Sequence, residues 1–114
     1  YCAMGPDQRG AMLRKFGKHL SIDGRVVLDV YSLNAFAERE ETAIYEHSFM
    51  DGFWSAEPYF GFLSTFKYDD DKVCLDKYTI IEPGRKREIY NWLQYFSTQE
   101  LEAEVRAAGL IVEE

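Results

Sequence analysis

The side chains best placed for chemistry follow a short apolar run at residues 26–30, within the stretch "RVVLDVYS". Asp29, Tyr31 and Ser32 lie at the carboxyl end of that run. Ligands of open α/β sheets bind beyond the carboxyl ends of the strands, so these three residues are candidate site residues. For Asp29, capping of local backbone amides is an equal alternative.

Other reactive side chains offer weaker signals. His19 is expected at a helix C-terminus, where a cation is favourable, and His47 on a strand; we interpret both as structural. The acidic turn at residues 69–71 lacks the alternating ligand spacing of a calcium loop, and no metal site is predicted. Cys2 and Cys74 lack metal-ligand spacing and are interpreted as buried, reduced thiols of a cytoplasmic protein.

Composition limits the classes of protein that fit. The chain has 114 residues, a net charge of -7, 46% hydrophobic residues and 16% aromatic residues. Its acidity argues against a nucleic-acid partner, and its apolar content against disorder. The sequence contains no apolar run of about 18 residues, so we predict no membrane partner. A small-molecule or protein partner fits this composition better.

Three helices are expected, at residues 6–20, 33–40 and 97–110. Pro6 suits a first helical position. Ser97 and Glu100 form a capping box, and Gly109 ends that helix in a left-handed conformation. These signals are local and specific.

Four strands are expected between the second and third helices, at residues 42–50, 59–68, 72–81 and 87–96. Short turns separate the last three, which predicts an antiparallel meander. Apolar side chains occur on both faces of these strands. We therefore expect one face of the sheet to be covered and the other to meet a ligand or partner. Residues 26–30 read as a strand buried on both faces, and residues 110–114 as the start of another strand.

The order of these elements resembles the C-terminal half of a class I S-adenosylmethionine-dependent methyltransferase. The resemblance rests on "YC" ending a strand, on "DGRVVLDVYS", on the inserted meander and on "STQELEAEVRAAGLIVEE". It implies an α/β fold: a partial Rossmann-like methyltransferase fold with an inserted antiparallel meander of about four strands. Residues 1–41 and 97–114 would belong to the core, and residues 42–96 to a lid over the substrate.

The same resemblance implies where cofactor and substrate would bind. Tyr1, Cys2, Ala3 and Met4 would lie beside the methionine portion of S-adenosylmethionine, and Tyr31 and Ser32 would face the substrate. The family often carries an acidic residue where Ala3 stands, so no catalytic residue is assigned. The family's glycine-rich loop has no counterpart, because no G-x-G occurs. The chain is therefore expected to be a fragment, inactive and without tight cofactor binding by itself.

Aromatic residues of the lid are the remaining substrate candidates, namely Trp54, Tyr59 and Trp92. Aromatic rings attract a sulfonium charge and pack against flat substrates. Gly52 and Pro58 interrupt the strands around Trp54 and Tyr59, which places both on a loop. For each of these aromatic residues, a place in the core is the alternative.

Two other classes of function compete with the enzyme. An aromatic antiparallel sheet could serve as a non-enzymatic interaction or dimerisation module, or hold an apolar ligand by itself. The doubly buried run at residues 26–30 favours the enzyme, because a self-contained meander has no use for it. In either case we expect self-association through exposed strand edges, in the simplest case as a dimer.

Overall fold

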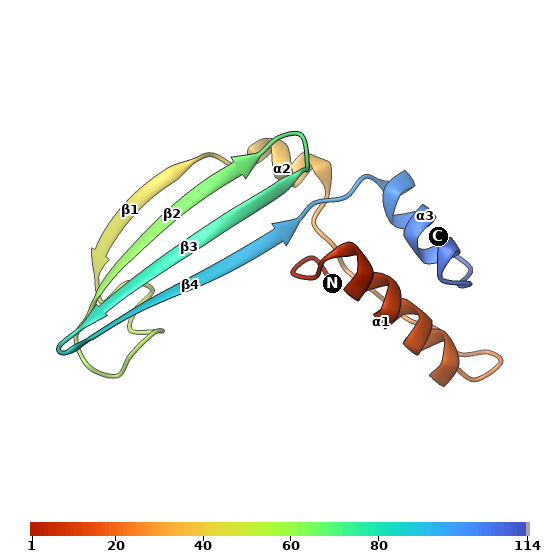
Figure 1. Cartoon of the computed structure of the whole chain (residues 1–114), viewed down its shortest axis with the longest axis horizontal. Helices are drawn as coiled ribbons and strands as arrows, with labels where there is room; N and C mark the ends of the chain where they lie inside the picture. The colour runs from red at the N-terminus through yellow and green to blue at the C-terminus, as the bar shows by residue number, and fades with distance from the viewer. Residues whose placement is uncertain (114) are drawn as a thin grey trace.

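The chain folds into a four-stranded meander and three helices (Figure 1). The computed structural model describes residues 1–113 and measures 53 × 29 × 22 Å. In chain order the elements are α1 (Pro6–His19), α2 (Leu33–Glu38), β1 (Thr42–His47), β2 (Phe60–Tyr68), β3 (Val73–Glu82), β4 (Arg85–Gln94) and α3 (Thr98–Ala107). Within the described residues, none of the helices has the length and apolar character that crossing a membrane requires.

The sheet has the strand order β1-β2-β3-β4, and every neighbouring pair is antiparallel. This confirms the predicted meander. The turn between β3 and β4 contains Gly84 at a φ of 76°, where glycine avoids the steric cost that a side chain would bring. The turn between β2 and β3 places Lys72 at a φ of 53°.

The helix ends follow their sequence signals. Ser97 caps α3, its side chain accepts a hydrogen bond from the Glu100 amide, and Glu100 completes the capping box. Gly109 has a φ of 83°, as predicted for the residue that ends this helix. Pro6 opens α1 at its first position. These predictions are confirmed because caps depend on residues only three or four positions apart.

The predicted strands outside the meander are wrong for the described residues. Residues 25–30 and 110–113 belong to no helix or strand, and Tyr1 and Cys2 lie in a turn. Val27 is 92% exposed. A strand forms only when a neighbour accepts and donates its backbone hydrogen bonds, and no described segment does so here. The only described parallel pairing is a single bridge between Ser32 and Phe96, so the parallel sheet of the expected α/β fold is absent from residues 1–113. Glu114 lies outside the described residues.

One face of the sheet, here named the covered face, carries the core. α2 packs there through Phe36 against Cys74 and Tyr95. The loop at residues 48–59 covers the rest, where Phe49 and Tyr59 pack on Ile80. The Ser48 amide donates to the Tyr59 carbonyl at 2.7 Å and closes this loop.

The opposite face, here named the open face, has no element packed on it among the described residues. Register places large apolar side chains of all four strands on it, each between 37% and 59% exposed. They are Tyr45 of β1, Phe60, Phe62, Phe66 and Tyr68 of β2, Ile81 of β3, and Tyr90 and Trp92 of β4. The prediction that one face is covered and the other is not is confirmed.

α1 and α3 lie side by side, apart from the main body of the sheet (Figure 1). The amide of Gln94, at the end of β4, donates to the carbonyl of Cys2 at 2.8 Å. The backbone around Tyr31 and Phe96 makes a second connection. The molecule is thus a helical pair joined to one end of a long sheet.

Candidate functional site

The region where the helical pair meets the sheet gathers four of the predicted site residues. The Phe96 amide donates to the Tyr31 carbonyl at 2.8 Å, beside the bridge between Phe96 and Ser32. The Tyr31 amide lies 3.5 Å from Cys2 Sγ. The Tyr1 ring packs against Phe96 with centroids 5.5 Å apart. Tyr1, Cys2, Tyr31 and Ser32 therefore share one region, named here the junction, around Phe96.

An ion pair between the two helices borders the junction. Arg9 of α1 is 4% exposed and donates through Nε and Nη2 to the two carboxylate oxygens of Glu104 of α3, at 2.9 and 2.6 Å. Its Nη1 donates to the Met4 carbonyl at 2.7 Å. The guanidinium carbon also lies 5.0 Å from the centroid of the Phe96 ring. Tyr1 donates its hydroxyl proton to Glu104.

These contacts alter the protonation equilibria of the three groups. Hydrogen bonds from Arg9 lower the pKa of the Glu104 carboxyl below its usual value. The same hydrogen bonds raise the pKa of Arg9. Burial, followed by the hydrogen bond to Glu104, raises the pKa of the Tyr1 hydroxyl. At neutral pH Tyr1 is thus a proton donor, Glu104 an anion and Arg9 a cation.

A second buried ionic group lies under the covered face. Asp76 of β3 is buried, pairs with Arg39 after α2, and accepts a 2.7 Å hydrogen bond from Thr65 Oγ1. Lys67 Nζ donates to the Arg39 carbonyl at 2.7 Å. All of these polar groups have partners, so the cluster ties α2 to the sheet and leaves no free group for a reaction.

The three aromatic residues predicted in the lid lie on two different faces. Tyr59 is 1% exposed, donates its hydroxyl proton to the Phe49 carbonyl, and belongs to the core under the covered face. Trp54 is half-buried in the same cluster, with its ring 5.0 Å from that of Tyr78. Trp92 lies on the open face, 5.7 Å from the Tyr68 ring. The structure does not bring these three together, and it gives Tyr59 the alternative role in the core.

The remaining candidates are dispersed. Ala3 is exposed and Met4 is half-buried, both in the turn that leads into α1. Asp29 is exposed in a segment outside the helices and strands. His47 ends β1 with its ring 5.3 Å from that of Phe60, and His19 Nδ1 lies 2.8 Å from the Lys15 carbonyl. Among residues 1–113 no three metal-ligating side chains converge.

The two cysteines are free and buried, as predicted.

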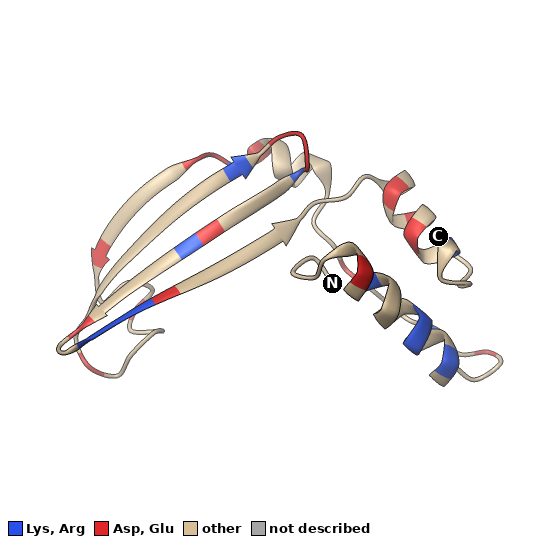
Figure 2. Ribbon diagram, viewed as in Figure 1, with Lys and Arg blue, Asp and Glu red and all other residues tan. Residues whose placement is uncertain are grey.

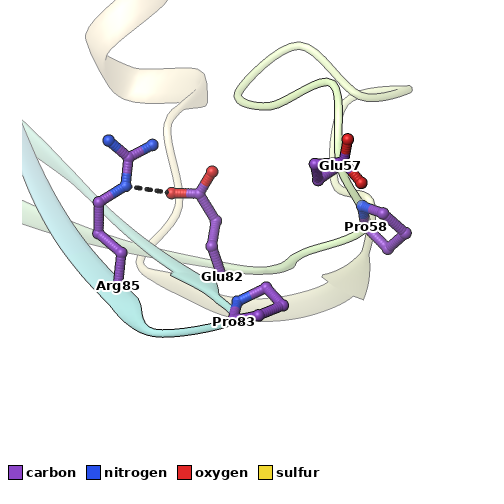
Figure 3. A pocket seen from close by; sticks show the side chains of 5 residues that line it. All are labelled: Glu57, Pro58, Glu82, Pro83 and Arg85. Atoms are coloured by element: carbon purple, nitrogen blue, oxygen red, sulfur yellow. Dashed lines mark hydrogen bonds and ion pairs between the residues drawn. The ribbon is translucent and has the colours of Figure 1, made fainter.

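A hollow lined by three charged residues and two prolines lies at the far end of the sheet, between the β3–β4 turn and the loop at residues 48–59 (Figure 3). Glu82 and Arg85 face one another there, with Arg85 Nε 2.8 Å from the Glu82 carboxylate. Glu57 and Pro58 lie across from them. Hydrogen bonds, first from Arg85, lower the pKa of Glu82 to about 2. The pair therefore stays ionised over the physiological range.

Sequence reasoning missed Arg9 and Glu104, although a signal for both existed. Arg9 stands four residues before Leu13, on the apolar stripe of α1. Glu104 stands three residues after Leu101, on the apolar stripe of α3. A charged residue on a buried stripe requires a partner of opposite charge. The spacing thus marks both residues, but it does not show that they pair with each other.

The comparisons with known proteins give a structural match. No protein-family model matches the chain, and no curated protein matches it by sequence. The chain is similar in structure to the CcbJ methyltransferase from Streptomyces caelestis, with a TM-score of 0.64 and 16% sequence identity. The match covers 99% of this chain and 43% of that chain. The four-stranded sheet and three helices therefore share their fold with part of a methyltransferase.

Proposed function

We propose that this chain is the lid-bearing, C-terminal part of an S-adenosylmethionine-dependent methyltransferase that acts on a small molecule. The observation that carries the proposal is the structural match, which extends over 99% of the chain and includes both the sheet and the helical pair. Fold by itself does not determine function. The proposal therefore also depends on the residues at the junction and on a direct test.

The unpaired segments support a division of the chain into core and lid. Residues 26–28 and 110–112 are apolar, and the segments 25–30 and 110–113 have no strand partner among the described residues. Ile111 and Val27 are highly exposed. In our proposal both segments gain strand partners from other parts of the complete gene product, in a parallel core to which residues 1–41 and 97–114 belong. Residues 42–96 then form the inserted lid.

The junction is where cofactor and substrate would meet. The family's cofactor supplies a methyl group on a sulfonium, and transfer by in-line displacement requires alignment and exclusion of water. Tyr1, Cys2, Ala3 and Met4 would line the cofactor's methionine portion, with the aromatic rings of Tyr1 and Phe96 closing the region to water. Tyr31 is half exposed and its ring lies 5.3 Å from that of Tyr95, so it would present a ring to a substrate.

These residues do not make a complete cofactor site. The rings of Tyr1 and Phe96 already face the Arg9 guanidinium, and the Tyr1 hydroxyl is engaged by Glu104. The sequence holds no glycine-rich loop for the rest of the cofactor. We derive no catalytic step from these residues, and we propose that other residues of the complete gene product complete the site.

The test is a calorimetric titration of S-adenosylmethionine into this chain and into the complete gene product. We expect micromolar affinity for the complete product and none for this chain. A complete product that does not bind would refute the methyltransferase proposal. Micromolar binding by this chain alone would refute the proposal that its cofactor site is incomplete.

A matched pair of substitutions tests the place of the cofactor. In the complete product, Ala3→Trp should weaken binding roughly tenfold, equivalent to about 1.4 kcal/mol, because the ring fills the space beside the turn. Ala11→Trp, at an exposed position of α1, should not change the affinity. If both variants and the unaltered protein bound S-adenosylmethionine with equal affinity, residues 1–4 would not belong to the cofactor site.

A non-enzymatic interaction module is the second candidate function. The open face of the sheet favours it, because large exposed aromatic surfaces mark sites of association. A complete product that binds partners through this face and binds no S-adenosylmethionine would support the module over the enzyme.

A further inference from the structure

We propose that the open face of the sheet packs against the same face of a second copy of this chain. The observation behind the proposal is its exposed area. Aromatic side chains present roughly 200 Å² each when fully exposed, so the eight partly exposed side chains amount to roughly 700 Å². The largest apolar patch on a typical monomer is about 300–600 Å². One partner of a standard stable interface contributes about 800 Å².

The charge pattern of the sheet permits two copies to approach. Figure 2 shows long stretches of the four strands without acidic or basic residues. Register places Lys77, Lys86 and Glu88 on the open face, which gives a net charge of +1, and Glu88 lies 3.6 Å from Lys77 and 3.3 Å from Lys86. A symmetric dimer brings each surface against itself, so a face with a large net charge would repel its copy. The net charge of +1 on this face is small, and both lysines have Glu88 as a neighbour of opposite charge.

The aromatic side chains form two groups toward opposite ends of the face. Tyr45 packs against Phe60 and Phe62 with centroids 5.9 and 5.0 Å apart. Tyr68 packs against Trp92 at 5.7 Å. Because the groups are already ordered by their own contacts, association would immobilise few additional side chains.

A small molecule covers too little of this surface to be its main occupant. The hollow lined by Tyr45, Phe60, Phe62 and Ile81 holds about 320 Å³ at one end of the face. A ligand there leaves the group of Tyr68 and Trp92 exposed. Only an occupant of the size of a second sheet covers both groups.

The strand edges are poorer sites for association than the face. The free edge strand β4 begins with Arg85, Lys86, Arg87 and Glu88, and charged edges resist pairing. The other edge strand, β1, has only six residues. We therefore assign self-association to the open face rather than to an edge.

Sedimentation equilibrium of the chain at micromolar concentration tests the proposal. We expect a dimer, with Tyr45→Glu and Trp92→Glu each raising its Kd at least roughly 30-fold, because buried aromatic residues dominate such interfaces. Circular dichroism should show unchanged folds, since both side chains are half exposed. Ile22→Glu, Val27→Glu and Ile111→Glu are matched controls that add the same charge at exposed positions off the face. They should leave the Kd unchanged.

Several outcomes would overturn this inference. A monomer at micromolar concentration would do so. Dissociation caused by Val27→Glu or Ile111→Glu would instead assign association to the unpaired segments. If Ile44→Pro in β1 caused dissociation and Tyr45→Glu had no effect, association would be assigned to the β1 edge of the sheet. The result is independent of cofactor binding, so failure of the methyltransferase proposal leaves this test unaffected.

Discussion

Removing the Glu104 carboxylate should destabilise the helical pair more than removing any neighbouring surface carboxylate. Arg9 is 4% exposed and Glu104 is 30% exposed, and the two form a bidentate ion pair. Loss of one member of a fully buried pair costs about 3–5 kcal/mol, because the other charge stays buried and unpaired. Partial exposure of Glu104 reduces this penalty. We therefore expect Glu104→Gln to cost about 2 kcal/mol.

The assay must report on the helices rather than on the sheet. Both tryptophans lie in the sheet region, at Trp54 and Trp92. Urea unfolding followed by circular dichroism at 222 nm reports on α1 and α3, and a cost of about 2 kcal/mol corresponds to roughly a 30-fold change in the unfolding equilibrium constant. Because the chain is proposed to dimerise, all variants are compared at one protein concentration.

Glu102 provides a matched control on the same helix. Its side chain is 31% exposed and lies 3.4 Å from Arg106, whose side chain is 59% exposed. Such helix-surface pairs contribute about 0.3–0.5 kcal/mol. Glu102→Gln should therefore cost less than about 0.5 kcal/mol. Equal costs for the two substitutions would refute the reasoning that burial of Arg9 sets the magnitude.

The pH dependence supplies an independent check. The folded chain holds the pKa of Glu104 below that of the unfolded chain, about 4.3. Its stabilising contribution is therefore fully present above that pKa and is lost as the pH falls through the lower folded value. The difference in stability between the unaltered chain and Glu104→Gln should shrink below about pH 4. A difference that grows on acidification would contradict this sign.

Three further predictions concern the sheet. A Cβ at Gly61 would lie 2.4 Å from Phe49 Cβ, so Gly61→Ala should lower the free energy of unfolding by about 1–3 kcal/mol, measured by tryptophan fluorescence in urea. Asp76→Ala leaves Arg39 without its carboxylate partner and should lower the free energy of unfolding by about 2 kcal/mol in the same measurement. Arg85→Met should raise the pKa of Glu82 from about 2 toward that of a free carboxyl, as followed by NMR titration.

Controls separate these effects from general sensitivity to substitution. Gly17→Ala, where a Cβ would meet Leu110 at 3.4 Å, should stabilise α1 by up to about 1 kcal/mol. Asp70→Ala lies in an exposed turn and should change stability by less than about 0.5 kcal/mol. In the unaltered chain, the contribution of Glu82 is present above the pKa of an unfolded carboxyl and is lost toward pH 2. A Glu82 pKa unchanged by Arg85→Met would contradict the assigned cause.

Local signals in the sequence were sufficient for the helices and the meander. The cap formed by Ser97 and Glu100 marks the start of α3 because the two residues are only three positions apart. Alternation along β2 was enough to place Phe60 and Phe62 on one face of that strand, because side chains of a strand point to opposite faces in turn. Antiparallel neighbours joined by short turns need no distant partner, and so their pairing could be predicted.

Pairing between distant segments was decided by the tertiary structure. Residues 26–30 have the composition of a buried strand, yet composition cannot supply the neighbour that would hydrogen-bond to it. Arg9 and Glu104 each signal the need for a partner of opposite charge, but they stand 95 positions apart, beyond the reach of any spacing rule. Tyr59 is an aromatic residue of a loop by sequence, and only the closure of that loop on the covered face buries it.

The sequence by itself determined which side chains of each strand share a face, because strand periodicity is a property of the backbone. Only the tertiary structure decided which face is covered. α2 and the loop at residues 48–59 fold onto one side, where Phe36 and Tyr59 complete the core. The opposite side keeps its aromatic residues exposed because no described segment reaches it.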